Sequence, residues 1–97
     1  MVEEPAGMLE DQIEQEVVER AEQFGYVVRK VQWVGRKSAP DRIFFGFGRC
    51  VLIEFKAPGE RPIGHQAKEI RRLQERYSEV YVCDNRAQAL RLLGIPA

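Results

Sequence analysis

Two β-rich runs, Asp41–Phe47 and Cys50–Lys56, follow each other in the chain with only the Gly48-Arg49 punctuation between them. Phenylalanine, valine and isoleucine favour extended backbone, and a two-residue connection that contains glycine is typical of a tight turn. The pattern therefore predicts an antiparallel β-hairpin over residues 41–56. A hairpin with apolar residues on both strands needs a sheet and covering helices around it.

The rest of the sequence supplies those elements. Apolar residues recur at helical spacing before and after the hairpin, and short apolar runs bounded by turn residues predict further strands. The expected order is α-β-β-β-α-β-α, an α/β fold with a mixed sheet flanked by helices. We expect a tail over residues 1–7 and one domain over 8–97. Before the hairpin the domain should have a helix Met8–Phe24, stopped by Gly25, and a strand Tyr26–Trp33. After the hairpin it should have a helix His65–Tyr77, a strand Val80–Cys83, and a last helix that is capped by Asp84 or Asn85 and ended by Gly94 and Pro96.

Composition limits the class of protein. The chain has 97 residues, of which 44% are apolar and 31% charged, as expected for one soluble globular domain. It contains no uncharged apolar run of about 18 residues and no signal-peptide pattern at its acidic N-terminus. Cys50 and Cys83 lie in apolar runs, which favours reduced thiols and a cytoplasmic location.

The charge is divided unevenly along the chain. The formal net charge is zero, but residues 1–24 hold eight acids against Arg20 alone, a balance of −7, and residues 25–97 hold fourteen bases against seven acids, a balance of +7. This asymmetry is compatible with a basic surface that faces a nucleic acid and with a separate acidic helix. It is equally compatible with ordinary solvated faces.

The second strand of the hairpin carries a glutamate and a lysine two residues apart. Side chains in a strand alternate between its faces, so Glu54 and Lys56 share one face of an otherwise apolar strand. If the turn contains an even number of residues, Asp41 on the partner strand points the same way. The sequence therefore predicts two carboxylates and one amine at a common place.

Such a group favours metal chemistry. Two nearby carboxylates repel each other unless a divalent cation lies between them, and hard oxygen ligands without histidine or cysteine indicate Mg²⁺, with Mn²⁺ as a substitute. A metal there would polarise a phosphoryl oxygen and acidify bound water, while Lys56 orients the water and offsets negative charge. This pattern predicts phosphodiester hydrolysis. The competing interpretation is a plain Glu54–Lys56 ion pair on an exposed strand.

The chain resembles the VRR-NUC branch of the PD-(D/E)xK nuclease superfamily, in particular its short stand-alone members from phages and bacteria. The likeness rests on a leading LEDQIE helix that ends at Gly25, the SAPDRIFF segment, the CVLIEFKAPGERP strand and loop, Gln66 at the start of a helix, and the closing VYVCD strand. The resemblance implies a restriction-endonuclease-like fold. It departs from the family at Ser38, where glycine is frequent, and at Ile63, where a capping Ser or Thr is expected.

The resemblance also implies roles for individual residues. Asp41 and Glu54 would be metal ligands, with the Phe55 backbone carbonyl beside them, Lys56 the catalytic lysine, and Gln66 a further member of the catalytic set. One glutamate of the first helix would complete the metal site. Glu10 is favoured because it opens that helix, and Glu14 is the alternative because residues four apart share a helical face.

The implied activity is a Mg²⁺-dependent endonuclease that acts on branched DNA such as four-way (Holliday) junctions, as a homodimer. Two other interpretations stay open: a branched-DNA-binding module that does not cut, and an interaction domain that depends on a partner chain. Bases in loops and helices near the predicted site are expected to hold DNA phosphates. These candidate DNA-binding residues are Arg36, Lys37, Arg61 and Lys68.

Overall fold

A computed structural model of the chain describes residues 9–96. The predicted tail over residues 1–7 and the predicted helix start at Met8 lie outside this range. The order of elements is the expected one, α-β-β-β-α-β-α. Their bounds are α1 Glu10–Phe24, β1 Val27–Lys30, β2 Arg42–Gly46, β3 Arg49–Phe55, α2 Gly64–Gln74, β4 Val80–Cys83 and α3 Arg86–Leu92.

The ends of α1 follow from local hydrogen bonds. At its start, the backbone N–H of Leu9 donates to the side-chain oxygen of Gln12 at 2.9 Å. At its end, Gly25 adopts φ 124°, a conformation that favours glycine, and its N–H donates to the carbonyls of Ala21 and Glu22. The prediction that Gly25 stops this helix is confirmed.

The hairpin forms in an antiparallel register, but its turn is one residue earlier than predicted. Gly46 pairs with Arg49, so Phe47 and Gly48 form a two-residue turn in place of Gly48 and Arg49. Both turn residues have positive φ, 54° and 72°, as the tight hairpin turns with matching twist require. The turn has an even length, which is the condition set for Asp41 and Glu54 to face the same way.

Two further boundaries were predicted too wide. The strand expected over Tyr26–Trp33 is only β1, because the N–H of Tyr26 caps α1 and the indole of Trp33 turns away toward Glu69. The helix expected to reach Tyr77 ends at Gln74, and the Tyr77 hydroxyl instead donates to the carbonyl of Cys50 in the sheet. Packing against neighbouring elements overrode the local pattern in both places.

Helix starts show the expected mixture of capped and uncapped ends. The side chain of Asn85 accepts from the N–H of Gln88 at 2.8 Å and so caps α3. Ile63 precedes α2 and provides no side-chain cap.

Ser38, in the loop between β1 and β2, has φ 72°, in the region that favours glycine, at a cost of about 1–2 kcal/mol for a residue with a Cβ. Thus Ser38 keeps a glycine-like backbone in the loop that leads to the buried Pro40.

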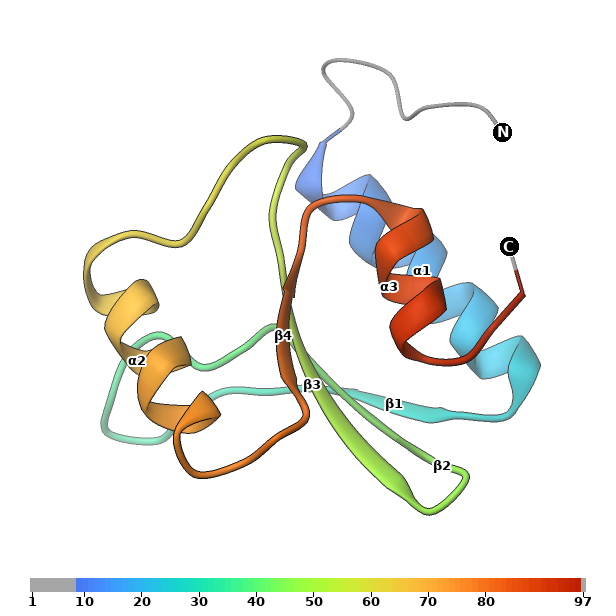
Figure 1. Cartoon of the computed structure of the whole chain (residues 1–97), viewed down its shortest axis with the longest axis horizontal. Coiled ribbons are helices and arrows are strands. Elements are labelled where there is room, and N and C mark those ends of the chain that lie inside the picture. The colour runs from blue at the N-terminus through green and yellow to red at the C-terminus, as the bar shows by residue number, and fades with distance from the viewer. Residues whose placement is uncertain (1–8, 97) are drawn as a thin grey trace.

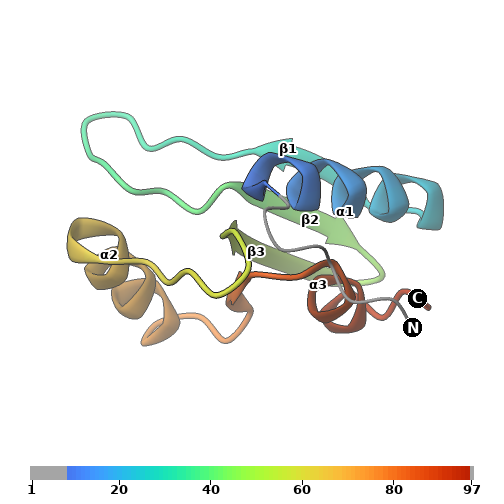
Figure 2. The same cartoon turned by 90° about the horizontal axis from the view of Figure 1, so that it is seen from above.

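The four strands form one mixed sheet in the order β1-β2-β3-β4, with β4 parallel to β3 and the other pairs antiparallel. Helices α1 and α3 lie together on one side of the sheet and α2 lies on the other (Figure 1). The buried core forms between the sheet and the α1/α3 pair, with Ile13, Val17, Phe44, Ile53 and Phe55 fully buried. Seen from above, the loop between β1 and β2 extends in the same direction as α2 (Figure 2).

Within residues 9–96 no helix is both long and apolar enough to cross a membrane. Cys50 and Cys83 are free thiols, Cys83 fully buried and Cys50 half-buried, in agreement with the expectation of reduced cysteines.

Candidate active site

Asp41 lies at the open end of the hairpin. Arg42 pairs with Ile53, and the same register continued by one residue places Asp41 opposite Glu54. Two backbone groups hold Asp41 in place: its Oδ2 accepts from the N–H of Phe55 at 2.8 Å, and its carbonyl accepts from the N–H of Val31 at 3.1 Å. Three segments of chain therefore determine where this carboxylate lies.

Glu54 and Lys56 share a face of β3 and its continuation, as strand alternation predicts. The Nζ of Lys56 lies 3.4 Å from Oε2 of Glu54. The same Nζ donates to Oε1 of Gln66, in the first turn of α2, at 2.6 Å. The exposed-strand interpretation of this pair is wrong, because Glu54 is only 1% exposed. Gln66 thus joins the predicted group through a direct contact with Lys56.

The carboxyl groups here are poorly stabilised as anions. Burial raises the pKa of Glu54 to about 7, helped by the charge of Asp41 and opposed by Lys56. Burial also raises the pKa of Asp41, although the N–H of Phe55 opposes this shift. The pKa of Glu10 is raised by burial and lowered in part by Lys56. The three acids therefore share a region in which the single amine of Lys56 does not balance their charge.

The two glutamates of α1 have different partners. Glu10 interacts electrostatically with Lys56 and Asp41, the residues of the predicted site. Glu14 makes an ion pair with Arg42, whose Nε donates to its Oε2 at 2.5 Å. Glu14 also raises the pKa of Asp41 electrostatically, so both glutamates act on the predicted site, and the ion pair with Arg42 distinguishes Glu14 from Glu10.

A divalent cation fits the chemistry of these side chains. As they stand, no three His, Cys, Asp or Glu side chains within residues 9–96 form a compact metal-binding cluster. Burial, together with the negative charge of neighbouring acids, nevertheless raises the pKa values of Asp41, Glu54 and Glu10, and oxygen donors of this kind suit Mg²⁺. Asp41, Glu54 and Glu10 are the residues that would hold the ion. The Phe55 carbonyl, predicted beside them, stays a prediction.

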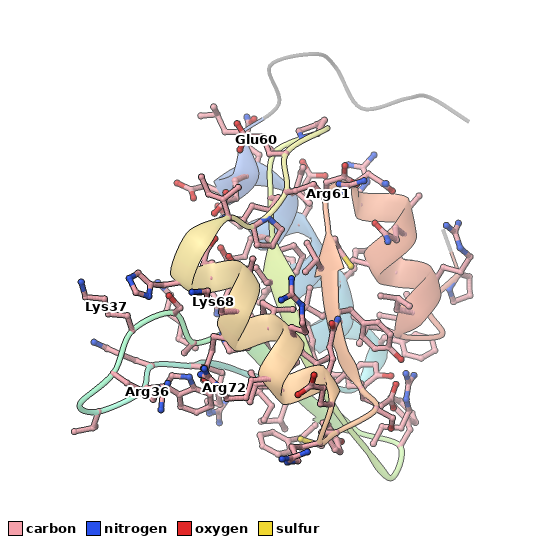
Figure 3. The ribbon with its side chains drawn as sticks, turned by 60° about the vertical axis from the view of Figure 1, so that its left-hand side comes forward. Arg36, Lys37, Glu60, Arg61, Lys68 and Arg72 are labelled. Carbon is pink, nitrogen blue, oxygen red and sulfur yellow. The ribbon has the colours of Figure 1, made fainter. Side chains whose placement is uncertain are left out.

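The candidate DNA-binding bases fall into two places (Figure 3). Arg36, Lys37 and Lys68 line one pocket together with His65, Glu69 and Arg72. Arg61 lies elsewhere, on the loop after β3, where its guanidinium makes an ion pair with Asp84 at 3.1 Å. Three of the four candidate bases therefore line one pocket, and Arg61 does not line it.

Sequence reasoning missed Glu69. It is 6% exposed, and its carboxylate accepts from the indole N–H of Trp33 at 2.9 Å and from Arg72 at 2.7 Å. The signal was weak, because a glutamate among basic residues on a helix is typical of a solvated face. Its burial depends on the loop 31–40, whose path the sequence does not reveal.

Comparison with known proteins agrees with this geometry. No family model matches the chain. "Putative nuclease p44" of Acyrthosiphon pisum secondary endosymbiont phage 1 is 35% identical over 77 residues, which cover 78% of this chain and 83% of that protein. A solved structure described as a VRR_NUC domain is 30% identical with a TM-score of 0.77, covering 88% of this chain and 94% of that one. The chain therefore belongs to the VRR-NUC nucleases of the PD-(D/E)xK superfamily.

Proposed function

We propose that this protein is a Mg²⁺-dependent endodeoxyribonuclease that uses Asp41, Glu54, Glu10, Lys56 and Gln66. The observation that supports it most strongly is the buried Glu54 carboxylate opposite Asp41, with Lys56 bound to both Glu54 and Gln66. A buried charged group of this kind is costly for folding, so a role in binding or catalysis accounts for it better than stability does.

Each residue has a defined part in phosphodiester hydrolysis. When bound, Mg²⁺ or Mn²⁺ would supply Lewis acidity toward a phosphoryl oxygen and toward water. Asp41, Glu54 and Glu10 provide the oxygen ligands, with the Phe55 carbonyl as a further one. Lys56 holds the water that attacks phosphorus and offsets negative charge on the phosphoryl oxygens, and Gln66 keeps the amine of Lys56 directed. Breaking the P–O ester bond leaves one phosphate end and one hydroxyl end.

The proposed substrate is branched DNA, with four-way junctions as the test case, and the proposed assembly is a homodimer in the cytoplasm. One chain carries one site, so paired nicks in two strands need two copies related by a two-fold axis. Val27 and Phe45 face each other across β1 and β2 and are 49% and 44% exposed, which supports an apolar contact with a second copy. Free Cys50 and Cys83 support a reducing compartment.

The decisive experiment compares a labelled four-way junction with the matching linear duplex, in Mg²⁺, Mn²⁺ or EDTA. We expect metal-dependent cleavage that favours the junction and is lost in Glu54→Gln. Glu19→Gln, which removes an exposed acid on α1, is the matched control and should cut like wild type. Tight binding with no cleavage under any metal condition would instead identify a branched-DNA-binding module. Cleavage that appears only after a partner protein is added would identify the partner-dependent domain.

The assembly is tested separately by sedimentation at micromolar concentration. A homodimer predicts twice the monomer mass, and Phe45→Glu should shift the chain toward monomer because it places a charge on the exposed apolar pair. Sedimentation of wild type only as a monomer would contradict the homodimer and leave the chemistry of the site unaffected.

A further inference from the structure

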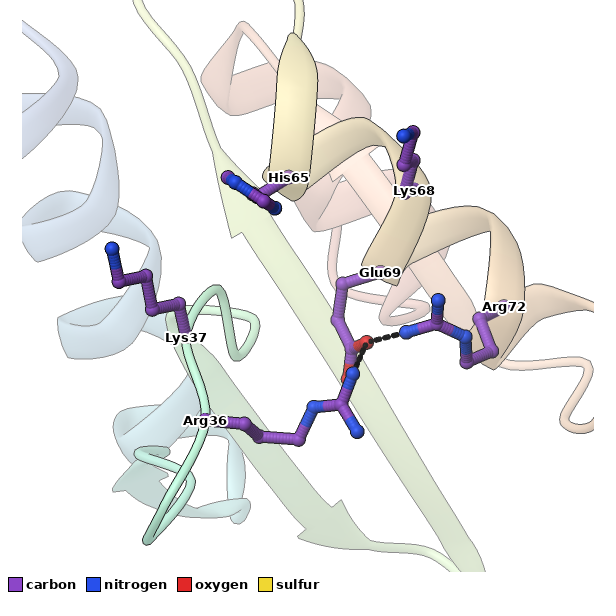
Figure 4. Close-up of a pocket in the computed structure, with 6 residues that line it drawn as sticks. All are labelled: Arg36, Lys37, His65, Lys68, Glu69 and Arg72. Atoms are coloured by element: carbon purple, nitrogen blue, oxygen red, sulfur yellow. Dashed lines mark hydrogen bonds and ion pairs between the residues drawn. The ribbon is translucent and has the colours of Figure 1, made fainter.

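A pocket of about 260 Å³ lies between the loop 31–40 and α2 (Figure 4). The loop contributes Arg36 and Lys37 to it. Helix α2 contributes a stripe at spacings of three and four residues, which consists of His65, Lys68, Glu69 and Arg72. The lining thus contains four cationic side chains and one carboxylate, a strong excess of positive charge in a single hollow.

Glu69 joins the two walls of this pocket. Its Oε1 accepts from Nη1 of Arg72 at 2.7 Å and lies 3.5 Å from Nη2 of Arg36, as the dashed lines in Figure 4 show. Its Oε2 accepts from the indole of Trp33 at 2.9 Å. A nearly buried carboxylate is tolerable only when it is paired in this way. Glu69 therefore ties the loop to the helix and holds two guanidinium groups at the rim.

The remaining charge is directed to solvent. The side chains of Arg36 and Arg72 are 59% and 57% exposed, although both touch Glu69. Lys37 and Lys68 make no ion pair with any residue of the described part, 9–96. One carboxylate neutralises one of the four cations, so the pocket keeps about three positive charges for a ligand. Arginine and lysine donors that line one pocket are suited to a phosphate group.

The pocket is close to the candidate active site but separate from it. Gln66, which binds Lys56, lies on the same helix as Glu69 and Arg72. At about 1.5 Å of rise per residue, these two residues lie about 4.5 and 9 Å further along the axis. A nucleic-acid strand rises about 3.4 Å per nucleotide, so for a strand that runs along α2 this offset corresponds to roughly one to three nucleotides.

We propose that this pocket binds a phosphate of the DNA backbone one to three nucleotides from the scissile phosphate, and that Glu69 is the positioning residue that organises it. The inference rests on the proposed function for the identity of the ligand. It adds His65 and Arg72 to the DNA-contacting surface and leaves Arg61, paired with Asp84, outside this subsite.

The test measures binding of a fluorescent DNA duplex to the full chain in EDTA, where no cutting occurs, over a range of salt concentrations. The slope of log K against log salt counts the phosphates that the protein neutralises. Lys37→Gln and Lys68→Gln should each reduce that slope by about 0.9. Arg91→Gln, which removes an exposed arginine from α3, is the matched control and should leave it unchanged. Slopes unchanged in both lysine variants would overturn the proposal.

Glu69→Gln separates positioning from simple charge. The substitution makes the pocket more positive, so charge alone predicts tighter DNA binding. If Glu69 positions Arg36 and Arg72, binding should weaken despite the added charge, because both side chains lose their anchor and must be ordered by the ligand. Binding equal to or tighter than that of wild type would overturn the role of Glu69.

A second variant covers the case in which Glu69→Gln does not fold. Trp33→Phe keeps an aromatic ring but removes the indole N–H donor to Glu69 and leaves the net charge unchanged, and it should also weaken binding. An unchanged affinity in this variant would contradict the loop-to-helix tie.

The phosphate-pocket proposal and the proposed nuclease function fail differently. Unchanged slopes with metal-dependent cutting would overturn only the proposal that the pocket binds a phosphate. Altered slopes with no cutting would overturn only the proposed nuclease function.

Discussion

The Nζ of Lys56 lies 2.6 Å from Oε1 of Gln66 and 3.4 Å from the carboxylate of Glu54, so a strand and a helix on one side of the sheet fix a single amine from two directions. A lysine side chain has four rotatable bonds, and one ion pair alone leaves its amine mobile. The hydrogen bond that Lys56 donates to Oε1 of Gln66 removes that freedom at the place where the amine would meet substrate.

Gln66→Ala should therefore lower kcat about 10- to 100-fold with little change in KM, because it displaces Lys56 without removing a group that binds DNA. Steady-state cleavage of a labelled junction measures both constants. Gln15→Ala, an exposed residue of α1, is the matched control. A Gln66→Ala enzyme with the kcat of wild type would show that Lys56 needs no second anchor.

Substitution of the central residues should separate activity from folding. Asp41→Ala, Glu54→Ala and Lys56→Ala should each abolish cleavage, since each removes a ligand or the charge beside the phosphoryl group. Circular dichroism should show that all three variants stay folded. Loss of helical signal in every variant would indicate that these residues serve the fold rather than the reaction.

The stability of the metal-free protein should fall as pH rises from about 4.5 to 7. The pKa of Glu54 is about 7 in the folded chain against an ordinary 4.5, so within this window the folded state holds a proton that the unfolded state has lost. Above pH 7 the loss in free energy of unfolding that ionisation of Glu54 causes is constant, at most about 3 kcal/mol. Urea unfolding in EDTA at several pH values measures it.

Glu54→Gln checks the assignment of that pH dependence. It should raise the free energy of unfolding at pH 8 and flatten the slope between pH 4.5 and 7, because a neutral amide replaces a buried carboxylate. A slope that persists unchanged in this variant would assign the effect to another group.

Added Mg²⁺ should raise Tm more at pH 8 than at pH 5.5, because the cation binds ionised carboxylates and competes with the proton on Glu54. The increase should vanish in Glu54→Gln. Differential scanning calorimetry with and without the metal provides the measurement. Equal shifts at both pH values would mean that the ion binds elsewhere.

The two glutamates of α1 should respond differently to neutralisation. Glu10→Gln should weaken Mg²⁺ activation of cleavage, since Glu10 interacts electrostatically with Lys56 and Asp41. Glu14→Gln should retain activity, because the carboxylate of Glu14 is already paired with Arg42. Titrating the rate with Mg²⁺ gives the apparent metal affinity of each variant, and the reverse order would assign the ligand to Glu14.

The sequence by itself determined the hairpin and the shared face of Glu54 and Lys56. Both follow from interactions between residues close in the chain: strand alternation with a period of two, and a two-residue turn with glycine. The error of one residue in the turn left its length even, so the expected position of Asp41 was unaffected. The family resemblance supplied Gln66 and the preference for Glu10.

Only the tertiary structure decided how distant elements meet. It brought Gln66 to Lys56, paired Glu14 with Arg42, and buried Glu69 beneath the loop 31–40. It also separated Arg61 from the other bases by pairing it with Asp84. These contacts depend on where each helix and loop packs on the sheet, which is set by the burial of whole surfaces, and no local repeat in the sequence records that placement.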